Sequence, residues 1–205
     1  MKVVNLGVIK FSEADALMRK MQKQRIADEI EDTLLICEHP DVVTIGPKAR
    51  NDGIQAPAGY LTVDVDRGGG LTWHGEGQIV IYPIIHWNQA DEANVSQIIH
   101  KLEEWIITAL SEHKISATRD ERMQGVWVDG HKVASIGLSF LRWVSRHGFT
   151  INVDTPAGRV ENLAACGMSP KTTTSLNALG HEVKEIEIID SLLKNSEEIL
   201  SRNIN

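Results

Sequence analysis

The chain has 205 residues, of which 42% are hydrophobic and 24% are charged, as in an ordinary globular protein that folds in water. Its net charge of −7 argues against general nucleic-acid binding, because the phosphate backbone attracts clustered Lys and Arg side chains. No apolar run approaches the roughly eighteen residues of a membrane span and no signal-peptide pattern opens the chain, so we expect one domain over residues 1–205, in the cytoplasm and away from membranes.

In the amino-terminal half, alternating and short apolar runs predict strands. These strands are expected at 3–9, 33–38, 42–45, 60–65 and 78–85. Between the first two, a helix is predicted from Ser12, which forms a capping box with Asp15, to about Asp32. Cys37 lies in the second strand and is expected to be a buried core thiol.

In the carboxyl-terminal half, the clearest helix is predicted from Val95 to His113, whose apolar residues share one face. Asp129 and Gly130 predict a tight hairpin turn between apolar runs, which puts Lys132 at the start of the return strand. The remaining elements are a strand at 149–153, a short helix at 158–165 and a terminal helix at 187–200. Several strands interrupted by two main helices predict an α+β, or mixed α/β, architecture.

The most distinctive segment runs from Asp66 to Gln78 and contains five glycines together with Arg67 and His74. Because glycine has no Cβ, such backbone lets main-chain N–H groups approach a ligand closely. Glycine-rich turns also serve as plain tight connections. The segment therefore predicts a binding loop only when other motifs support it.

Three further motifs support it, so that the chain contains, in order, RGGGLTWHGEGQ, GVWVDGHKVASIG, RWVSRHGFTINV and AACGMSPKTTTSL. With this order and spacing, most of residues 34–176 resembles the lipoyl (octanoyl) transferases, which move an octanoyl group from acyl carrier protein to a lysine of lipoate-dependent enzymes. The resemblance implies the fold of the biotin and lipoate protein ligases, a mixed sheet flanked by helices. Glu76 and Ala165 stand where this family usually has proline, and although neither change removes a reacting group, both could alter loop rigidity.

The resemblance also implies a covalent mechanism through Cys166. Its thiolate would attack the octanoyl thioester, and an acceptor lysine would then attack the acyl-enzyme to form an amide, without ATP or any other cofactor. The family pattern puts Lys132 beside this cysteine, where an ammonium would stabilise the thiolate by lowering the thiol pKa from its free value of about 8.5. Both Cys37 and Cys166 are expected to be free thiols, and without a CxxC pair no metal site is expected.

The octanoyl tail requires a narrow apolar channel. By resemblance, the channel walls come from Arg67, Gly68, Gly69, Gly70, Leu71, Thr72, Trp73, His74, Ser135, Ile136, Gly137, Gly148, Phe149 and Thr150. The N–H groups around Gly75 to Gly77 and near Cys166 are the expected donors to a tetrahedral oxyanion. His39 and His147 fall in motif-like positions, but both are expected to be structural residues.

The partners implied by the resemblance are octanoyl-acyl carrier protein as donor, with lipoyl domains of 2-oxoacid dehydrogenase E2 subunits and the glycine cleavage H protein as acceptors. Such partners are usually acidic and so is this chain, so a local basic patch is expected to attract them. Its expected members are Arg119, Arg122, Arg142, Arg146 and Lys171.

Three alternatives compete with this interpretation. An ATP-dependent lipoate or biotin ligase shares the fold but needs no nucleophilic cysteine. An amidotransferase would move octanoyl between lipoyl domains, again through cysteine, and a non-catalytic module would only carry acyl groups or dock lipoyl domains. The motif around Cys166 favours the carrier-dependent transferase, because a reactive thiol distinguishes it from the ligase and the binding module.

Overall fold

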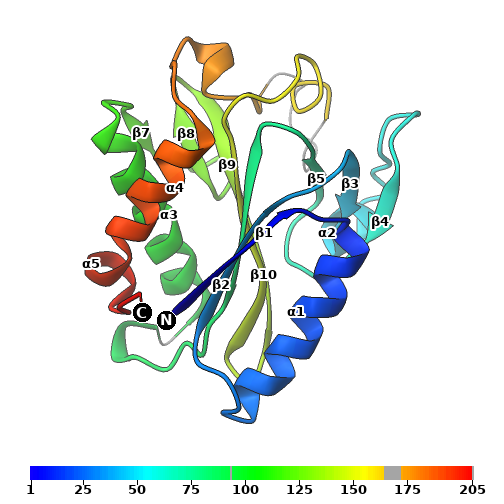
Figure 1. The fold of residues 1–205 in the computed structure, drawn as a ribbon. Helices are drawn as coiled ribbons and strands as arrows, with labels where there is room; N and C mark the ends of the chain where they lie inside the picture. The colour runs from blue at the N-terminus through cyan, green and yellow to red at the C-terminus, as the bar shows by residue number, and fades with distance from the viewer. Residues whose placement is uncertain (93, 164–171, 205) are drawn as a thin grey trace.

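A mixed seven-stranded sheet forms the centre of the computed structural model, which describes residues 1–92, 94–163 and 172–204 (Figure 1). The first pair in the sheet, β1 and β2, is parallel, and every other pair is antiparallel. In spatial order the strands are β1 (Lys2–Val8), β2 (Thr33–Glu38), β6 (Gln78–Ile84), β10 (Val144–Asn152), β9 (His131–Leu141), β8 (Val126–Val128) and β7 (Ala117–Thr118).

A second, three-stranded sheet lies beside it and consists of β4 (Thr62–Asp64), β3 (Val42–Ile45) and β5 (Leu71–His74), in that order. The central strand β3 is parallel to β4 and antiparallel to β5. Leu71–His74 in the middle of the glycine-rich segment is therefore strand rather than loop. Pairing with β3 fixes this part of the segment in the second sheet and orients its side chains.

Helices cover both faces of the main sheet (Figure 1). On one face lies α1 (Phe11–Ile26), which packs on β2, β6 and β10 through apolar residues such as Met18. The other face is covered by α3 (Val95–Glu112), α4 (Glu185–Lys194) and α5 (Ser196–Leu200). The described residues also form the short helices α2 (Pro47–Asn51), η1 (Ala90–Glu92) and η3 (Asn177–Leu179).

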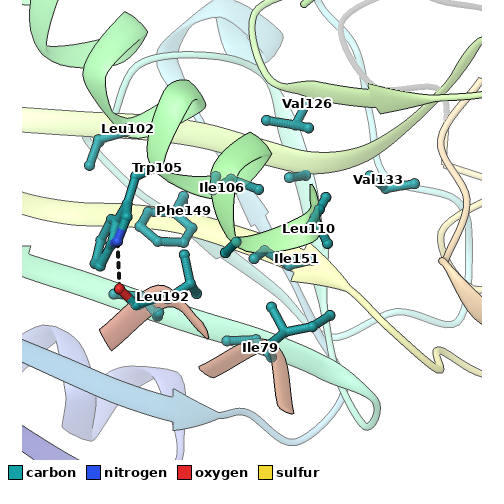
Figure 2. Packing of buried hydrophobic residues seen from close by; sticks show 14 of the residues in the cluster. Ile79, Leu102, Trp105, Ile106, Leu110, Val126, Val133, Phe149, Ile151 and Leu192 are labelled. Carbon is teal, nitrogen blue, oxygen red and sulfur yellow. Dashed lines mark hydrogen bonds between the residues drawn. The ribbon is translucent and has the colours of Figure 1, made fainter. Parts of the chain in front are cut away.

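The larger core lies between α3 and the sheet (Figure 2). The Asn94 side chain caps α3 by accepting a hydrogen bond from the Gln97 N–H. Trp105 is fully buried, donates from Nε1 to the Leu192 carbonyl at 2.7 Å and meets the Phe149 ring edge to face with centroids 5.6 Å apart. These contacts join α4, α3 and β10, so the rear of the candidate site rests on a rigid core.

The expected mixed sheet flanked by helices is confirmed, and several element boundaries are wrong. The first helix begins at Phe11 and ends at Ile26; its N-cap is Lys10, with no side-chain cap, so the predicted capping box does not form. Ser12 lies inside the helix instead. Asp15 binds Arg19 and Arg146, which accounts for its position without any capping role.

In the carboxyl-terminal half, residues 158–162 form turns rather than the expected helix, and part of that expectation, 164–165, lies outside the described residues. The expected terminal helix is two helices, α4 and α5, separated at Asn195, whose side chain donates to Glu112 and to the Ser191 carbonyl. None of the helices in the described residues is long and apolar enough to cross a membrane.

Candidate active site

A cavity of about 650 Å³ lies where the glycine-rich segment meets β9 and β10. The pairing of these two strands sets the order of residues along the cavity wall, since Ser135 pairs with Thr150 and Leu138 pairs with His147. Lys132 also lines it, from the start of β9. The cavity therefore extends along the β9–β10 pair, with its lysine toward one end of that pair and His147 toward the other.

The predicted acyl-binding residues converge on this cavity, with one exception. The lining residues from the predicted set are Arg67, Gly68, Gly69, Gly70, Leu71, Thr72, His74, Ser135, Ile136, Gly137, Gly148, Phe149 and Thr150. Trp73 is not among them. Its indole is buried in a separate cluster with Val43 and Leu163 and donates from Nε1 to Asp41, because successive residues of a strand face opposite sides.

Close backbone contact forms one wall of the cavity. The Gly68 N–H donates to the Leu138 carbonyl at 3.0 Å, which draws the glycine-rich segment onto β9. A Cβ on Gly137 would lie only 2.8 Å from the Gly68 carbonyl oxygen and 3.0 Å from Arg67 Cδ. Glycine at 137 is thus needed for the two segments to approach each other.

Arg67 braces the glycine-rich segment from inside. The residue is 7% exposed, and its guanidinium donates to the carbonyls of Gly68, Gly70 and Thr44. It also donates to the hydroxyls of Thr44 and Thr72, each at 2.8 Å. Arg67 therefore lies in the cavity wall, where it was predicted. Its guanidinium points toward the carbonyls of the glycine-rich segment itself.

A chain of buried side chains continues from Thr44 toward the other end of the cavity. Gln78 donates from Nε2 to Asn152 Oδ1 at 2.8 Å, so its own oxygen accepts from His74 Nδ1 at 2.9 Å. His74 Nε2 is then left as the acceptor that faces the Thr44 hydroxyl at 3.2 Å. Burial, with the nearby His39 and Arg67, lowers the pKa of His74 well below its ordinary value, so the imidazole is neutral at pH 7.

The same chain reaches Lys132 through Thr174. Asn152 donates from Nδ2 to the Thr174 carbonyl at 3.0 Å, and the Thr174 N–H donates to the Lys132 carbonyl. The Lys132 N–H in turn donates to the Thr172 carbonyl. Lys132 is 5% exposed and is fixed at the cavity wall by this short strand-like pairing.

Cys166, the predicted nucleophile, lies outside the described residues. Its described neighbours on either side border the site: Leu163 and Thr173 both line a small hollow of about 20 Å³ together with Ser135 and Thr150. Cys37 occupies β2 as predicted, buried and free. Burial, with a smaller contribution from Glu38, raises the pKa of the Cys37 thiol to about 12.

Aromatic and imidazole rings gather where Phe11, Tyr82 and His147 line the cavity. His39 Nδ1 donates to the Ile9 carbonyl at 2.7 Å, so its Nε2 accepts from the Tyr82 hydroxyl, also at 2.7 Å. Burial lowers the pKa of His39, although the bond to Ile9 opposes the shift. The Phe11 ring lies beside His147, with centroids 6.3 Å apart.

His147 lies in the left-handed region, with φ of +59°, and its side chain contacts an ion pair between buried Arg146 and half-exposed Asp66. Its Nε2 lies 3.0 Å from Asp66, and Arg146 makes two hydrogen bonds to the same carboxylate. Burial lowers the pKa of His147 to about 4 against the opposing effect of Asp66. Burial also opposes the shift at Asp66, yet the bonds from Arg146 and His147 hold the pKa of that carboxyl well below its usual range.

The positions of Arg146 and Gly77 differ from the sequence-based expectations, whereas the donors expected near Cys166 lie outside the described residues. Arg146 is 5% exposed and pairs with Asp66 and Asp15, so it belongs to the interior and not to a basic surface patch. The Gly77 N–H donates to Glu38 Oε2 at 3.1 Å and is therefore engaged rather than ready for an oxyanion. The residues 75–77 do not line the cavity.

The other proposed patch members have varied positions. Arg119 pairs with two glutamates of α3, and Arg142 lies exposed in the turn between β9 and β10. Arg122 lines the cavity, pairs with Asp120 and lies 4.4 Å over the Trp127 ring. Lys171 lies outside the described residues. Of the expected patch, Arg122 is the described member that lines the cavity.

Sequence reasoning missed several residues that line the cavity: Phe11, Lys48, Tyr82, Val95, Ile99, Glu121, Met123, Gln124 and Leu138. Tyr82 offered a signal, since it is the one hydroxyl in the otherwise apolar run Ile79–Ile85 and a buried hydroxyl needs a partner. Phe11 offered none, because its contact with the site depends on how α1 packs.

Comparison with known proteins gives the family of this chain. The family described as the lipoyl protein ligase A/B catalytic domain matches residues 11–197. An octanoyltransferase of Caldicellulosiruptor saccharolyticus is 35% identical over 203 residues, covering 95% of this chain and 86% of that protein.

Two kinds of solved structure share the fold. Lipoate-protein ligase A bound with ATP matches with a TM-score of 0.71 and 12% identity, over 100% of this chain and 87% of that chain. The biotin protein ligase of Aquifex aeolicus matches with a TM-score of 0.60 and 15% identity, over 98% of this chain and 69% of that chain. At such low identity the likeness concerns the fold alone.

Proposed function

This chain belongs to the octanoyltransferases, within the lipoyl protein ligase A/B catalytic domain family, and on that premise we propose that residues 1–205 form one catalytic domain that transfers octanoyl from acyl carrier protein to a lysine of a lipoyl domain. The acceptors proposed are the lipoyl domains of 2-oxoacid dehydrogenase E2 subunits and the glycine cleavage H protein. Cys166 carries the acyl group between donor and acceptor, and Lys132 is its partner.

The observation that carries the proposal is the elongated cavity with a buried lysine in its wall. Leu138 faces His147 across the strand pair, and Lys132 lies six residues earlier on β9. At about 3.3 Å per residue, Lys132 is roughly 20 Å along the strand from the end of the cavity near His147. An extended octanoyl tail is roughly half as long, so the cavity has room for a tail that starts at a thioester near Lys132 and points toward the ring cluster without reaching it.

The cavity wall supports the same substrate class. Backbone from the glycine-rich segment and from Gly137 and Gly148 leaves space beside the strands, and Phe149 and Ile136 supply apolar surface. Each buried CH₂ contributes roughly 0.8 kcal/mol, so the seven carbons beyond the carbonyl would contribute about 5 kcal/mol at most.

The proposed chemistry has two balanced halves. The Cys166 thiolate forms a bond to the thioester carbon while the bond to the pantetheine sulfur breaks, and the Lys132 ammonium gives its proton to that leaving sulfur. The acceptor amine then forms a bond to the same carbon while the bond to Cys166 breaks. Lys132, now an amine, takes the proton that the attacking nitrogen loses, which regenerates the ammonium and the thiolate.

The neighbourhood of Lys132 supports this pairing of roles. Thr172, which follows the segment that contains Cys166, accepts the Lys132 N–H, and Thr174 donates back to the Lys132 carbonyl. Leu163, which precedes that segment, is buried in the cluster that contains Leu71 of the glycine-rich segment. The chain thus leaves and re-enters the described structure beside the cavity.

Intact-mass measurement tests the proposal. The protein is incubated with octanoyl-acyl carrier protein, then with an apo lipoyl domain, with and without ATP. We expect the mass of the enzyme to increase by one octanoyl group, which then moves to the lipoyl domain without ATP. A requirement for ATP, or transfer without an acylated enzyme, would overturn the proposed mechanism.

A further inference from the structure

The end of the Lys132 side chain rests against the backbone of Gly125, the residue that precedes β8. A Cβ placed on Gly125 would lie 2.5 Å from Lys132 Cε and 3.2 Å from its Nζ, and it would overlap the Ala134 carbonyl. Gly125 also has φ of +132°, a backbone conformation that residues other than glycine rarely adopt. Gly125 therefore defines the space that the Lys132 amine occupies.

A buried carboxylate holds Gly125 in place. The Gly125 N–H donates to Glu103 Oε1 at 2.9 Å, and the other oxygen of Glu103 accepts from Arg119 Nε at 3.0 Å. Glu103 is only 3% exposed, although its neighbours on the buried face of α3 are apolar. A carboxylate is rarely buried without such partners, so its two bonds explain how the fold tolerates it.

The position of Glu103 on α3 makes it a fixed point. Leu102 and Trp105, on either side of it, are fully buried in the core, and the Asn94 side chain caps the same helix. The adjoining residues Met123 and Gln124 line the cavity. A rigid helix is thus connected through one hydrogen bond to the loop against which the lysine packs.

From these contacts we infer that Glu103 is a positioning residue, which keeps the Lys132 amine at the cavity wall by holding Gly125. The inference rests on the proposed function for the importance of Lys132, and it concerns the location of the amine, which can be measured without any transfer reaction. Glu103 touches neither substrate nor the reacting atoms and is not itself a catalytic residue.

The test compares Glu103→Ala and Gly125→Ala with two matched controls. Glu104→Ala removes the neighbouring glutamate, which is exposed and binds Arg119 Nη2 at 2.7 Å but makes no bond to Gly125. Asn94→Ala removes the cap of the same helix and so weakens α3 at a distance from Gly125. Circular dichroism and thermal unfolding show which variants are folded at the labelling temperature.

The readout is the labelling rate of Lys132 by an amine-reactive ester, followed by peptide mass spectrometry. In Glu103→Ala we expect Lys132 to be labelled about tenfold faster than in the wild type. The reason is that the hydrogen bond from the Gly125 N–H to the Glu103 carboxylate, which opposes local opening of this loop, is lost. Gly125→Ala should also speed labelling, since its Cβ displaces the lysine. Both controls should label at about the wild-type rate.

Unchanged labelling in Glu103→Ala, or an equal increase in Asn94→Ala, would overturn the inference. The octanoyl-transfer rate measured on the same variants separates it from the proposed function. Faster Lys132 labelling with an undiminished transfer rate would support the positioning role of Glu103 and would contradict the catalytic role proposed for Lys132.

Discussion

The side chain of Gln78 donates a hydrogen bond to the side chain of Asn152 at 2.8 Å, and both residues are almost fully buried. Gln78 also accepts from His74, while Asn152 donates to the Thr174 carbonyl. Two neighbouring amides therefore connect the glycine-rich segment with the stretch that pairs with Lys132. Such a network is stable only when each polar group keeps its partner.

Asn152→Ala should therefore destabilise the protein and slow octanoyl transfer. The change removes the bonds from Gln78 Nε2 and to the Thr174 carbonyl, although Gln78 Nε2 still donates to the Trp73 carbonyl, and we expect a loss of about 1–3 kcal/mol in the free energy of unfolding. Urea denaturation measures it. Asn5→Ala, which removes an exposed amide that accepts only from the Gly7 N–H, should change the free energy of unfolding by less than about 0.5 kcal/mol. Equal effects in the two variants would refute the importance of the network.

Cys166→Ala should abolish transfer, whereas Cys37→Ala should leave it largely intact. The Cys37 thiol is 5% exposed and its pKa is raised to about 12, so it stays protonated and unreactive at neutral pH. Peptide mapping after brief treatment with iodoacetamide should find alkylation at Cys166 before Cys37. The covalent mechanism fails if Cys166→Ala retains full activity.

The stability of the protein should fall as the pH decreases from about 6.5 to about 4. The unfolded chain binds a proton at His147 near pH 6.5, but the folded protein does not do so until about pH 4, because burial lowers the pKa of this imidazole. Unfolding is therefore favoured throughout that window, by up to about 3 kcal/mol from this group, and the effect levels off below it. His39 and His74, whose pKa values are also lowered, add to the same trend.

Urea denaturation at several pH values measures this slope, with His147→Asn as the comparison, since asparagine tolerates the positive φ at this position. Between about pH 6.5 and about pH 4, the free energy of unfolding of the variant should depend on pH less steeply than that of the wild type, by the contribution of about one proton. A slope equal to that of the wild type would show that His147 does not contribute. Asp66 acts in a different window, because the stability that comes from its lowered pKa is lost only as the pH falls below about 4.

Phe11→Ala should shift the acyl preference toward longer chains. Phe11 lines the cavity beside the His147 ring, and removal of its ring lengthens the space available to the tail. A long tail that buries two more methylenes in this space gains about 1.6 kcal/mol, so kcat/KM for hexadecanoyl relative to octanoyl should increase about tenfold. Met18→Ala, a buried change on the same helix but outside the cavity lining, should reduce stability without changing that ratio. An equal shift in the two variants would exclude a specific role for Phe11.

The features that could be predicted from the sequence are those that depend on residues close together in the chain. Glycine spacing identified the segment at 66–78, and apolar periodicity identified α3 almost to the residue. Trp73 was assigned to the channel as part of a loop, whereas β5 makes it alternate away from Thr72 and His74. A loop motif carries no such alternation, so the direction of one side chain required the strand pairing.

Other features depend on contacts between distant segments. Arg146 resembles a surface cation in sequence, but Asp66 lies eighty residues away in the chain and reaches it only through the fold. Glu103 likewise resembles one of many glutamates on a surface helix. Its carboxylate is buried because the strand that follows Gly125 brings an N–H to it.

Arg67 has a consequence for the thermodynamics of acyl binding. Its hydrogen bonds to the carbonyls of Gly68, Gly70 and Thr44 order a segment that glycine would otherwise leave with many conformations. The conformational entropy of the glycine-rich segment is therefore lost when the protein folds and not when the acyl tail binds. Most of the hydrophobic free energy of the tail then remains available as affinity, as in other preorganised sites.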